Sequence, residues 1–201
     1  VHLNCQSSAD VSILDVREDH MRFRNKVVII IGAGSGIGRQ ASEVFSREGA
    51  RVVRVDINKD ALSKLDGESS SNHNELTVIA DVMDENQVKG VMAKTLEAFG
   101  VIDILVNAVG GSTVIKNSFA ETDDLSVDDW DQMMRFNLRG VFLCTREAII
   151  HMKKQKNGKI VNLASVAGRG VSEFSSSAYA AAKAGVIIFT KKVAIEVGPY
   201  G

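Results

Sequence analysis

Short apolar runs alternate with longer segments of period near 3.6 along most of this chain. The apolar runs predict strands at residues 27–31, 51–55, 77–80, 103–107 and 159–163. The longer segments predict helices at 36–48, 59–65, 84–99, 126–152 and 175–197. Strands that alternate with helices are typical of βαβ units. We therefore expect an α/β fold with a doubly wound parallel sheet.

The longest helical segment, residues 126–152, has apolar side chains at steps of three and four residues. This spacing predicts one buried face along the whole segment. The face comprises Trp130, Met134, Leu138, Val141, Phe142, Ala148, Ile149 and Met152. Two polar stretches, 67–74 and 110–124, predict surface loops.

Composition and charge exclude several classes of protein. The 201 residues are 45% hydrophobic and 24% charged, as in one ordinary globular domain. Residues 1–21 read as a polar N-terminal tail, and 22–201 as a single domain. A net charge of -1 disfavours nucleic-acid binding. No apolar run is long enough to span a membrane, which favours a cytoplasmic protein.

The two cysteines, Cys5 and Cys144, are far apart and outside any metal-binding pattern. We therefore expect neither a disulfide framework nor a metal site. Cys144 lies in an apolar helical segment with no activating neighbour in the sequence, so we expect a reduced core residue there.

A glycine-rich turn follows the first predicted strand, where a Rossmann-type sheet binds a nucleotide. Its candidate cofactor-binding residues are Gly32, Ser35, Gly36, Ile37 and Gly38. Glycines let the backbone approach a pyrophosphate, and the N-terminus of the following helix supplies N–H donors. The spacing is GxxxGxG rather than GxGxxG. The alternative is that the turn binds nothing and only connects the strand tightly to the helix.

Asp56 ends the second predicted strand, and Ile57 follows it. A carboxylate at this point accepts hydrogen bonds from both ribose hydroxyls and repels the 2'-phosphate of NADP. We therefore expect both residues to lie at the cofactor, with NAD favoured and NADP disfavoured. The alternative is that Asp56 only caps the next helix.

Tyr179 and Lys183 lie four residues apart in the last predicted helix, so their side chains share one face. A tyrosine hydroxyl titrates near pH 10 in water. An ammonium about 4 Å away stabilises the phenolate by about 4 kcal/mol at an effective dielectric of about 20. The pair is therefore a candidate general acid and base, although the same spacing also occurs on solvated helices. Small residues surround the pair, which favours close approach of another helix or a cofactor over a solvated helix surface.

Ser165 and Asn137 are the other candidate catalytic residues. Ser165 follows the fifth predicted strand, at the edge of the sheet where ligands bind, and its hydroxyl could bond a substrate oxygen. It could equally be a turn or capping serine. Asn137 interrupts an apolar helical segment, which indicates either exposure to water or a specific role.

Together these residues resemble the short-chain dehydrogenase/reductase family, including its 3-oxoacyl-(acyl-carrier-protein) reductase-like members, from Arg22 onward. The shared motifs follow the family's order: IGAGSGIG at 31–38, DV at 81–82, VNAVG at 106–110, FN at 136–137, IVNLAS at 160–165 and YAAAK at 179–183. The departures are Ile31 in place of threonine, VNAVG in place of VNNAG, and one extra residue between Ser165 and Tyr179.

The resemblance implies a role for each matching residue. Tyr179 would be the acid/base and would also contact the cofactor, and Lys183 would assist its ionisation and bind the nicotinamide ribose. Ser165 would orient the substrate, and Asn137 would break the helix and belong to a proton relay through water. The further positions implied at the cofactor and the sheet beneath it are Asp81, Val82, Asn107, Ala108 and Gly110.

The resemblance also implies an architecture and an assembly. We expect strand order 3-2-1-4-5, in a catalytic domain truncated at the C-terminus relative to the seven strands of the family. The helices at 126–152 and 175–197 would pair with copies of themselves in a homodimer or homotetramer.

The expected function is that of an oxidoreductase which transfers a hydride between NAD and a small-molecule ketone or secondary alcohol. Two other classes stay open. One is a non-catalytic, NAD-binding regulatory or scaffold protein. The other is a nucleotide-dependent transferase, which would have no use for Tyr179.

Overall fold

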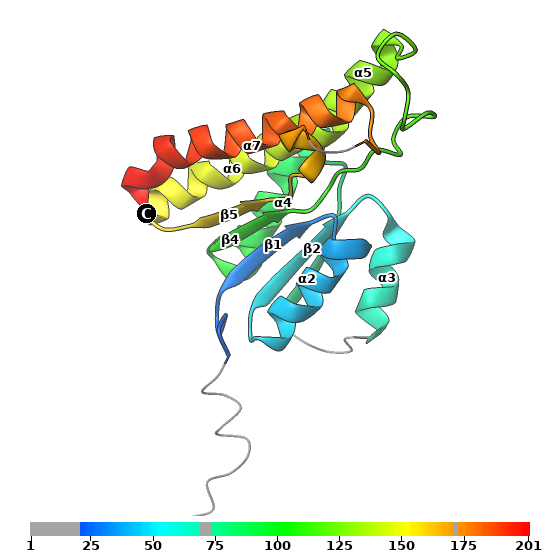
Figure 1. The fold of residues 1–201 in the computed structure, drawn as a ribbon. Coiled ribbons are helices and arrows are strands. Elements are labelled where there is room, and N and C mark those ends of the chain that lie inside the picture. The colour runs from blue at the N-terminus through cyan, green and yellow to red at the C-terminus, as the bar shows by residue number, and fades with distance from the viewer. Residues whose placement is uncertain (1–20, 69–73, 171–172) are drawn as a thin grey trace, which may run out of the picture.

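The computed structural model describes residues 21–68, 74–170 and 173–201, so most of the tail and much of the loop predicted at 67–74 lie outside the described residues. Five strands form one sheet: β1 (Val27–Ile31), β2 (Arg51–Asp56), β3 (Glu75–Ile79), β4 (Ile104–Asn107) and β5 (Lys159–Asn162). All neighbouring strands are parallel, in the order β3-β2-β1-β4-β5 (Figure 1). This confirms the expected α/β fold and strand order.

Helices cover both faces of the sheet (Figure 1). One face carries α2 (Gly36–Arg47) and α3 (Lys59–Glu68). The other carries α4 (Glu85–Phe99) and α6 (Gly140–Gln155), with α7 (Ser177–Val197) beside α6.

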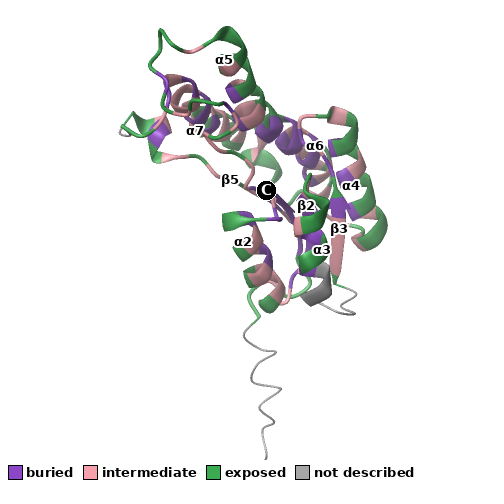
Figure 2. Cartoon of the chain, turned by 90° about the vertical axis from the view of Figure 1, so that its right-hand side faces the viewer, coloured by how far each residue is buried: buried purple, intermediate pink, exposed green. Residues whose placement is uncertain are grey.

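Side chains of the central strand β1 divide the core between these two layers. Ile29 and Ile31 belong to the cluster shared with α4 and α6, whereas Val28 and Ile30 belong to the cluster beneath α2 and α3. All five β1 residues are at most 2% exposed. Figure 2 shows the buried residues on the sheet and on the inward faces of the helices. Burial of each such side chain contributes about 1.5–3 kcal/mol.

The segment predicted as one helix at 126–152 is divided by a π-helical turn. It consists of α5 (Val127–Met134), the turn η1 (Arg135–Arg139) and α6. A π turn holds one extra residue, which rotates the helix on its N-terminal side relative to the helix on its C-terminal side. The buried residue ahead of the turn is therefore Met133, at 0% exposure, rather than Met134.

Part of the predicted buried face of this segment is wrong. Trp130 and Phe142 are both 39% exposed. Phe142 instead packs edge-on against Phe189 of α7, with ring centroids 6.1 Å apart. The residues that fill the core around the middle of α6 are Val141, Leu143, Cys144 and Ala148, so the expected core position of Cys144 is confirmed.

At the outer edge of the sheet, β5 has side chains of alternating exposure. Ile160 and Asn162 face α6 and α7, whereas Val161 on the opposite face is 49% exposed. Across the described residues, no helix is both long and apolar enough to cross a bilayer.

Candidate active site

A cavity of about 390 Å³ lies at the carboxyl ends of β1, β2 and β4. Residues on its wall come from the glycine-rich turn, from the ends of the strands and from the π turn. Ten of the predicted cofactor residues line it: Gly32, Ser35, Gly36, Ile37, Asp56, Ile57, Asp81, Val82, Ala108 and Gly110. The structure thus brings together residues that are up to 78 positions apart in the sequence.

The glycine-rich turn places the N-terminus of α2 at this cavity. Ser35 is the N-cap of α2, and its hydroxyl makes no capping hydrogen bond to the first helical turn. A side chain at Gly38 would collide with the carbonyl oxygen of Gly32, so the tight packing of the turn requires glycine there. N–H groups at a helix N-terminus favour an anion, and the cavity therefore suits a pyrophosphate.

Asp56 is held in a fixed orientation at the same cavity. One carboxylate oxygen accepts from the backbone N–H of Gly34 at 2.9 Å, and the other accepts from the N–H of Asn58 at 2.9 Å. The capping hydrogen bond of α3 comes from the side chain of Asn58, which accepts from the N–H of Ala61 at 3.1 Å. The capping role considered for Asp56 is thus filled by Asn58.

The loop after β3 supplies a third wall. Asp81 accepts a hydrogen bond from the N–H of Met83 at 2.8 Å, and Arg139 of the π turn donates to the carbonyl of Met83 at 2.6 Å. Val82 is 7% exposed and packs against Gly140. These contacts tie the loop to the start of α6.

Asn107 does not line the cavity. It is 2% exposed, and its amide donates to Thr145 at 3.2 Å and to Asn162 at 2.8 Å. It joins β4 to β5 and α6 beneath the cavity, which fits the sheet-supporting role that the resemblance implied.

Tyr179 and Lys183 lie on adjacent turns at the start of α7. The N-cap Ser176 accepts a hydrogen bond from the N–H of Tyr179 at 3.3 Å. The Lys183 Nζ lies 5.9 Å from the centre of the Tyr179 ring and donates to the carbonyl of Leu163 at 2.9 Å. Lys183 is 3% exposed, and burial lowers its pKa because an ammonium is costly to remove from water. The Leu163 carbonyl was not anticipated, because a backbone acceptor leaves no signal in the residue types.

Ser165 is the N-cap of a 3-10 turn, η2 (Val166–Arg169), and its hydroxyl accepts from the N–H of Ala167 at 3.2 Å. Ser165 is thus a capping serine, as one of the two interpretations expected. Because its oxygen is the acceptor in this bond, the hydroxyl hydrogen stays available for a second partner. The turn packs directly on α7, because a Cβ at Gly168 would lie 2.6 Å from the backbone of Ala184 and Lys183. Ser165 is thereby fixed relative to Lys183.

Asn137 lies in the π turn and is fully buried, so its exposure to water is excluded. Its Oδ1 accepts from the N–H of Gly111 at 2.9 Å, and its Nδ2 donates to the carbonyl of Gly111 at 3.0 Å. The same Nδ2 also lies 3.2 Å from the carbonyl of Met133. The side chain thus ties the loop after β4 to the break in the helix.

Gly110 is the point where these elements meet. It lines the cavity, and its φ is 146°. A Cβ built there would lie 2.6 Å from the Nζ of Lys183 and 2.8 Å from the Oδ1 of Asn137. The cavity at the glycine-rich turn, called the glycine-turn cavity below, therefore meets the candidate catalytic residues at Gly110.

We expect Gly110→Ala to reduce kcat by about a hundredfold or more, because displacement of about 1 Å at a catalytic group has that effect. Gly111→Ala is the matched control, since the nearest atom to its added Cβ is the Thr113 hydroxyl at 4.0 Å. Steady-state kinetics and thermal melting of both variants check this prediction. Equal kcat values for the two variants would contradict it.

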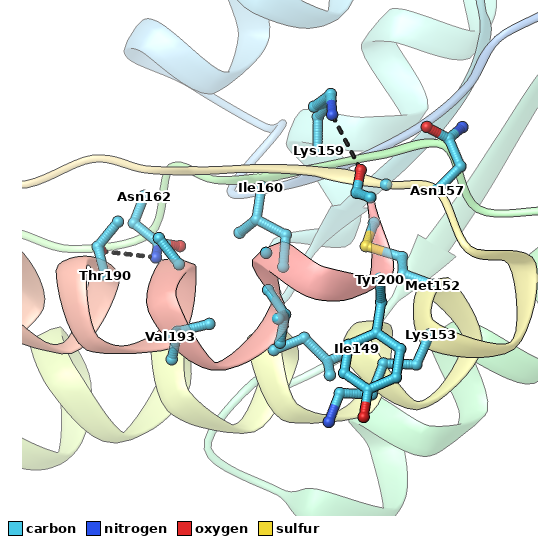
Figure 3. A pocket seen from close by; sticks show the side chains of 15 residues that line it. Ile149, Met152, Lys153, Asn157, Lys159, Ile160, Asn162, Thr190, Val193 and Tyr200 are labelled. Atoms are coloured by element: carbon cyan, nitrogen blue, oxygen red, sulfur yellow. Dashed lines mark hydrogen bonds between the residues drawn. The ribbon is translucent and has the colours of Figure 1, made fainter.

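A second cavity of about 260 Å³ lies between β5, α6 and α7 (Figure 3). Its wall is mainly aliphatic, with Ile149 and Val193 among the side chains, and Lys153 and Tyr200 lie at one end. It contains none of the predicted site residues, so it is not the candidate active site.

Two other kinds of chemistry find no support in the described part of the chain. Burial raises the pKa of the Cys144 thiol to about 12, which leaves it an inert core residue. The ranges 21–68, 74–170 and 173–201 contain no group of three or more side chains placed to hold a metal ion.

Comparisons with known proteins agree with this arrangement. Residues 26–201 match the short chain dehydrogenase family. The chain is 39% identical over 181 residues to meso-2,3-butanediol dehydrogenase of Serratia marcescens. The aligned part covers 90% of this chain and 69% of that protein. It is 38% identical over 178 residues to 3-oxoacyl-(acyl-carrier-protein) reductase of Thermotoga maritima, which covers 88% of the chain and 70% of that protein.

The same relationship appears in three dimensions. The crystal structure of levodione reductase matches with a TM-score of 0.81 at 38% identity, over 89% of this chain and 69% of that one. Sequence motifs, sheet order and the placement of the site residues thus lead to one conclusion. The chain belongs to the short-chain dehydrogenase/reductase family, whose members are oxidoreductases that act on alcohols and ketones.

Proposed function

We propose that this protein interconverts a ketone and a secondary alcohol with NAD as its cofactor, and that Tyr179 is the general acid and base. The observation that carries the proposal is the position of Gly110, which lines the glycine-turn cavity and lies against Lys183 and Asn137. A cofactor bound in that cavity would therefore lie close to the residues proposed for proton transfer. When bound, NAD supplies the acceptor or donor of the hydride.

The chain's own residues divide the remaining work. The Tyr179 hydroxyl donates a proton to the carbonyl oxygen in reduction, and its deprotonated oxygen accepts one from the alcohol in oxidation. Lys183, fixed by the carbonyl of Leu163, places its ammonium beside the Tyr179 ring. Ser165 orients the substrate oxygen, and Asn137 fixes the wall around Lys183 and supports the proton relay.

Asp56 makes NAD the preferred cofactor in this proposal. Its carboxylate is already oriented by two backbone N–H groups, and a 2'-phosphate placed beside it would be repelled. We expect Asp56→Ala to lower the ratio of kcat/KM for NAD to that for NADP by about tenfold or more, equivalent to about 1.4 kcal/mol. Asp60→Ala on the exposed start of α3 is the matched control. An unchanged ratio in Asp56→Ala would remove Asp56 from the cofactor site.

The proposed function is tested by nicotinamide absorbance, with NAD and NADP each offered to a panel of secondary alcohols that includes meso-2,3-butanediol. Turnover with NAD is expected. Binding of NAD without turnover of any alcohol or ketone would instead support a non-catalytic NAD-binding regulatory or scaffold protein.

The outer surface of α6 and α7 fits an interface with a second copy of this chain. Phe142, Ile150, Ile188 and Ile195 are between 39% and 74% exposed on these two helices. Large apolar side chains left exposed on neighbouring helices are typical of protein interaction sites. We therefore propose a homodimer or homotetramer, which sedimentation would distinguish from a monomer.

A further inference from the structure

We propose that Asn162 and Thr190 are positioning residues, which set the place of α7 along β5 and so hold Lys183 of that helix against Gly110 at the wall of the glycine-turn cavity. The inference rests on the proposed function, because it assigns these residues to the support of its acid/base pair. Neither residue is among the candidate catalytic or cofactor-binding groups. Both line the aliphatic cavity of Figure 3 rather than the cofactor cavity.

The helix α7 is joined to β5 by two side-chain hydrogen bonds. Lys183 donates to the carbonyl of Leu163 at 2.9 Å, just after the last residue of β5. Asn162 donates to the hydroxyl of Thr190 at 2.9 Å, as the dashed line in Figure 3 marks. Thr190 is seven residues after Lys183, so the two attachments lie two turns apart on one face of α7. The two attachments add to the packing of η2 on α7 and oppose sliding of the helix along β5.

The donors and acceptors of this link have a single consistent direction. The Thr190 hydroxyl donates to the carbonyl of Val186 at 2.7 Å, so it must accept from Asn162. The carbonyl oxygen of Asn162 then faces the other way and accepts from Asn107 at 2.8 Å. Asn107 uses its second hydrogen on Thr145 of α6 at 3.2 Å. A continuous chain of bonds thus runs from α6 through β4 and β5 to α7.

The buried end of this chain of bonds constrains its position. Asn107 and Thr145 are at most 2% exposed, whereas Asn162 and Thr190 are partly buried. A buried amide that loses its partners is destabilised, so Asn107 favours the one register in which Asn162 reaches both it and Thr190. The Asn107 Oδ1 has no partner within the described residues, which leaves the amide of Asn107 dependent on Thr145 and Asn162.

The test separates kcat from KM in variants of Thr190. We expect Thr190→Val to lower kcat by about tenfold or more with little change in the KM for NAD, because Thr190 does not line the glycine-turn cavity. Thr190→Ser keeps the hydroxyl and is expected to return kcat to that of the unmodified protein.

Thr95→Val is the matched control. Thr95 is a buried threonine of α4 whose hydroxyl also donates to a carbonyl of its own helix, that of Val91 at 2.8 Å. Its kcat should equal that of the unmodified protein. Thermal melting shows that each variant is folded, and Thr190→Ala replaces Thr190→Val if the latter is not. An unchanged kcat in the folded Thr190 variant would overturn the positioning role. If Lys183→Met also leaves kcat unchanged, the proposed function itself fails, so the two failures are distinguishable.

Discussion

Replacement of Tyr179 by phenylalanine is expected to lower kcat by about a thousandfold, the typical contribution of a positioned general acid or base. The change removes one oxygen atom and keeps the ring that lies beside the Lys183 Nζ. The KM for NAD should change little, because Tyr179 does not line the glycine-turn cavity. Steady-state kinetics with the best alcohol of the panel, together with thermal melting, measure both quantities.

Tyr200→Phe provides the control for this prediction. Tyr200 is the only other tyrosine of the chain, and its ring stacks with Lys153 at the far end of α7. Its variant should retain the kcat of the unmodified protein. Full activity in Tyr179→Phe would eliminate the acid/base mechanism and would favour a reaction without this hydroxyl, such as nucleotide-dependent group transfer.

Glu75→Ala is expected to destabilise the fold by about 3–5 kcal/mol, because it leaves a buried guanidinium without its carboxylate. Glu75 of β3 accepts two hydrogen bonds from Arg54 of β2, both at 2.8 Å, and the side chain of Arg54 is 3% exposed. Denaturant unfolding gives the free energy. The comparison variant is Glu48→Ala, which breaks the exposed pair with Arg22 and should destabilise the fold far less, because water screens an exposed ion pair.

The buried pair itself is not expected to be a net source of stability. Removing two charges from water costs several kcal/mol, so an apolar pair of similar volume is often equally stable. We expect Arg54→Met combined with Glu75→Leu to recover most of the stability that Glu75→Ala loses. A double variant as unstable as Glu75→Ala would show that the charges themselves hold β2 and β3 together.

The arrangement of the sheet could be predicted from the sequence because its signals are local. The apolar run of β1 and the alternation of strands with helices predict a parallel, doubly wound sheet. The order of its strands came from the resemblance to the family. The predicted start of β3 is two residues late, because Glu75 reads as a polar end of the strand. Its partner Arg54 is 21 positions away, and nothing local to either residue indicates the pairing.

The residues of the candidate site could be named from their motifs, whereas the contacts that hold them could not. Lys183 bonds the carbonyl of Leu163, and Asn137 bonds the backbone of Gly111. Both partners are main-chain groups whose position depends on the whole fold. The resemblance implied a break of the helix at Asn137, but the π-helical form of that break was not predicted, because helical periodicity alone does not show one inserted residue. That residue is why the predicted buried face was wrong ahead of the turn.

The central claim is that Lys183, buried and fixed by the carbonyl of Leu163, assists Tyr179 as the proton donor and acceptor of the proposed reaction. The most direct measurement is the kcat of Lys183→Met beside that of the unmodified protein, with NAD and the best alcohol of the panel. The account predicts that Lys183→Met lowers kcat by about a hundredfold or more. An unchanged kcat without Lys183 would contradict it.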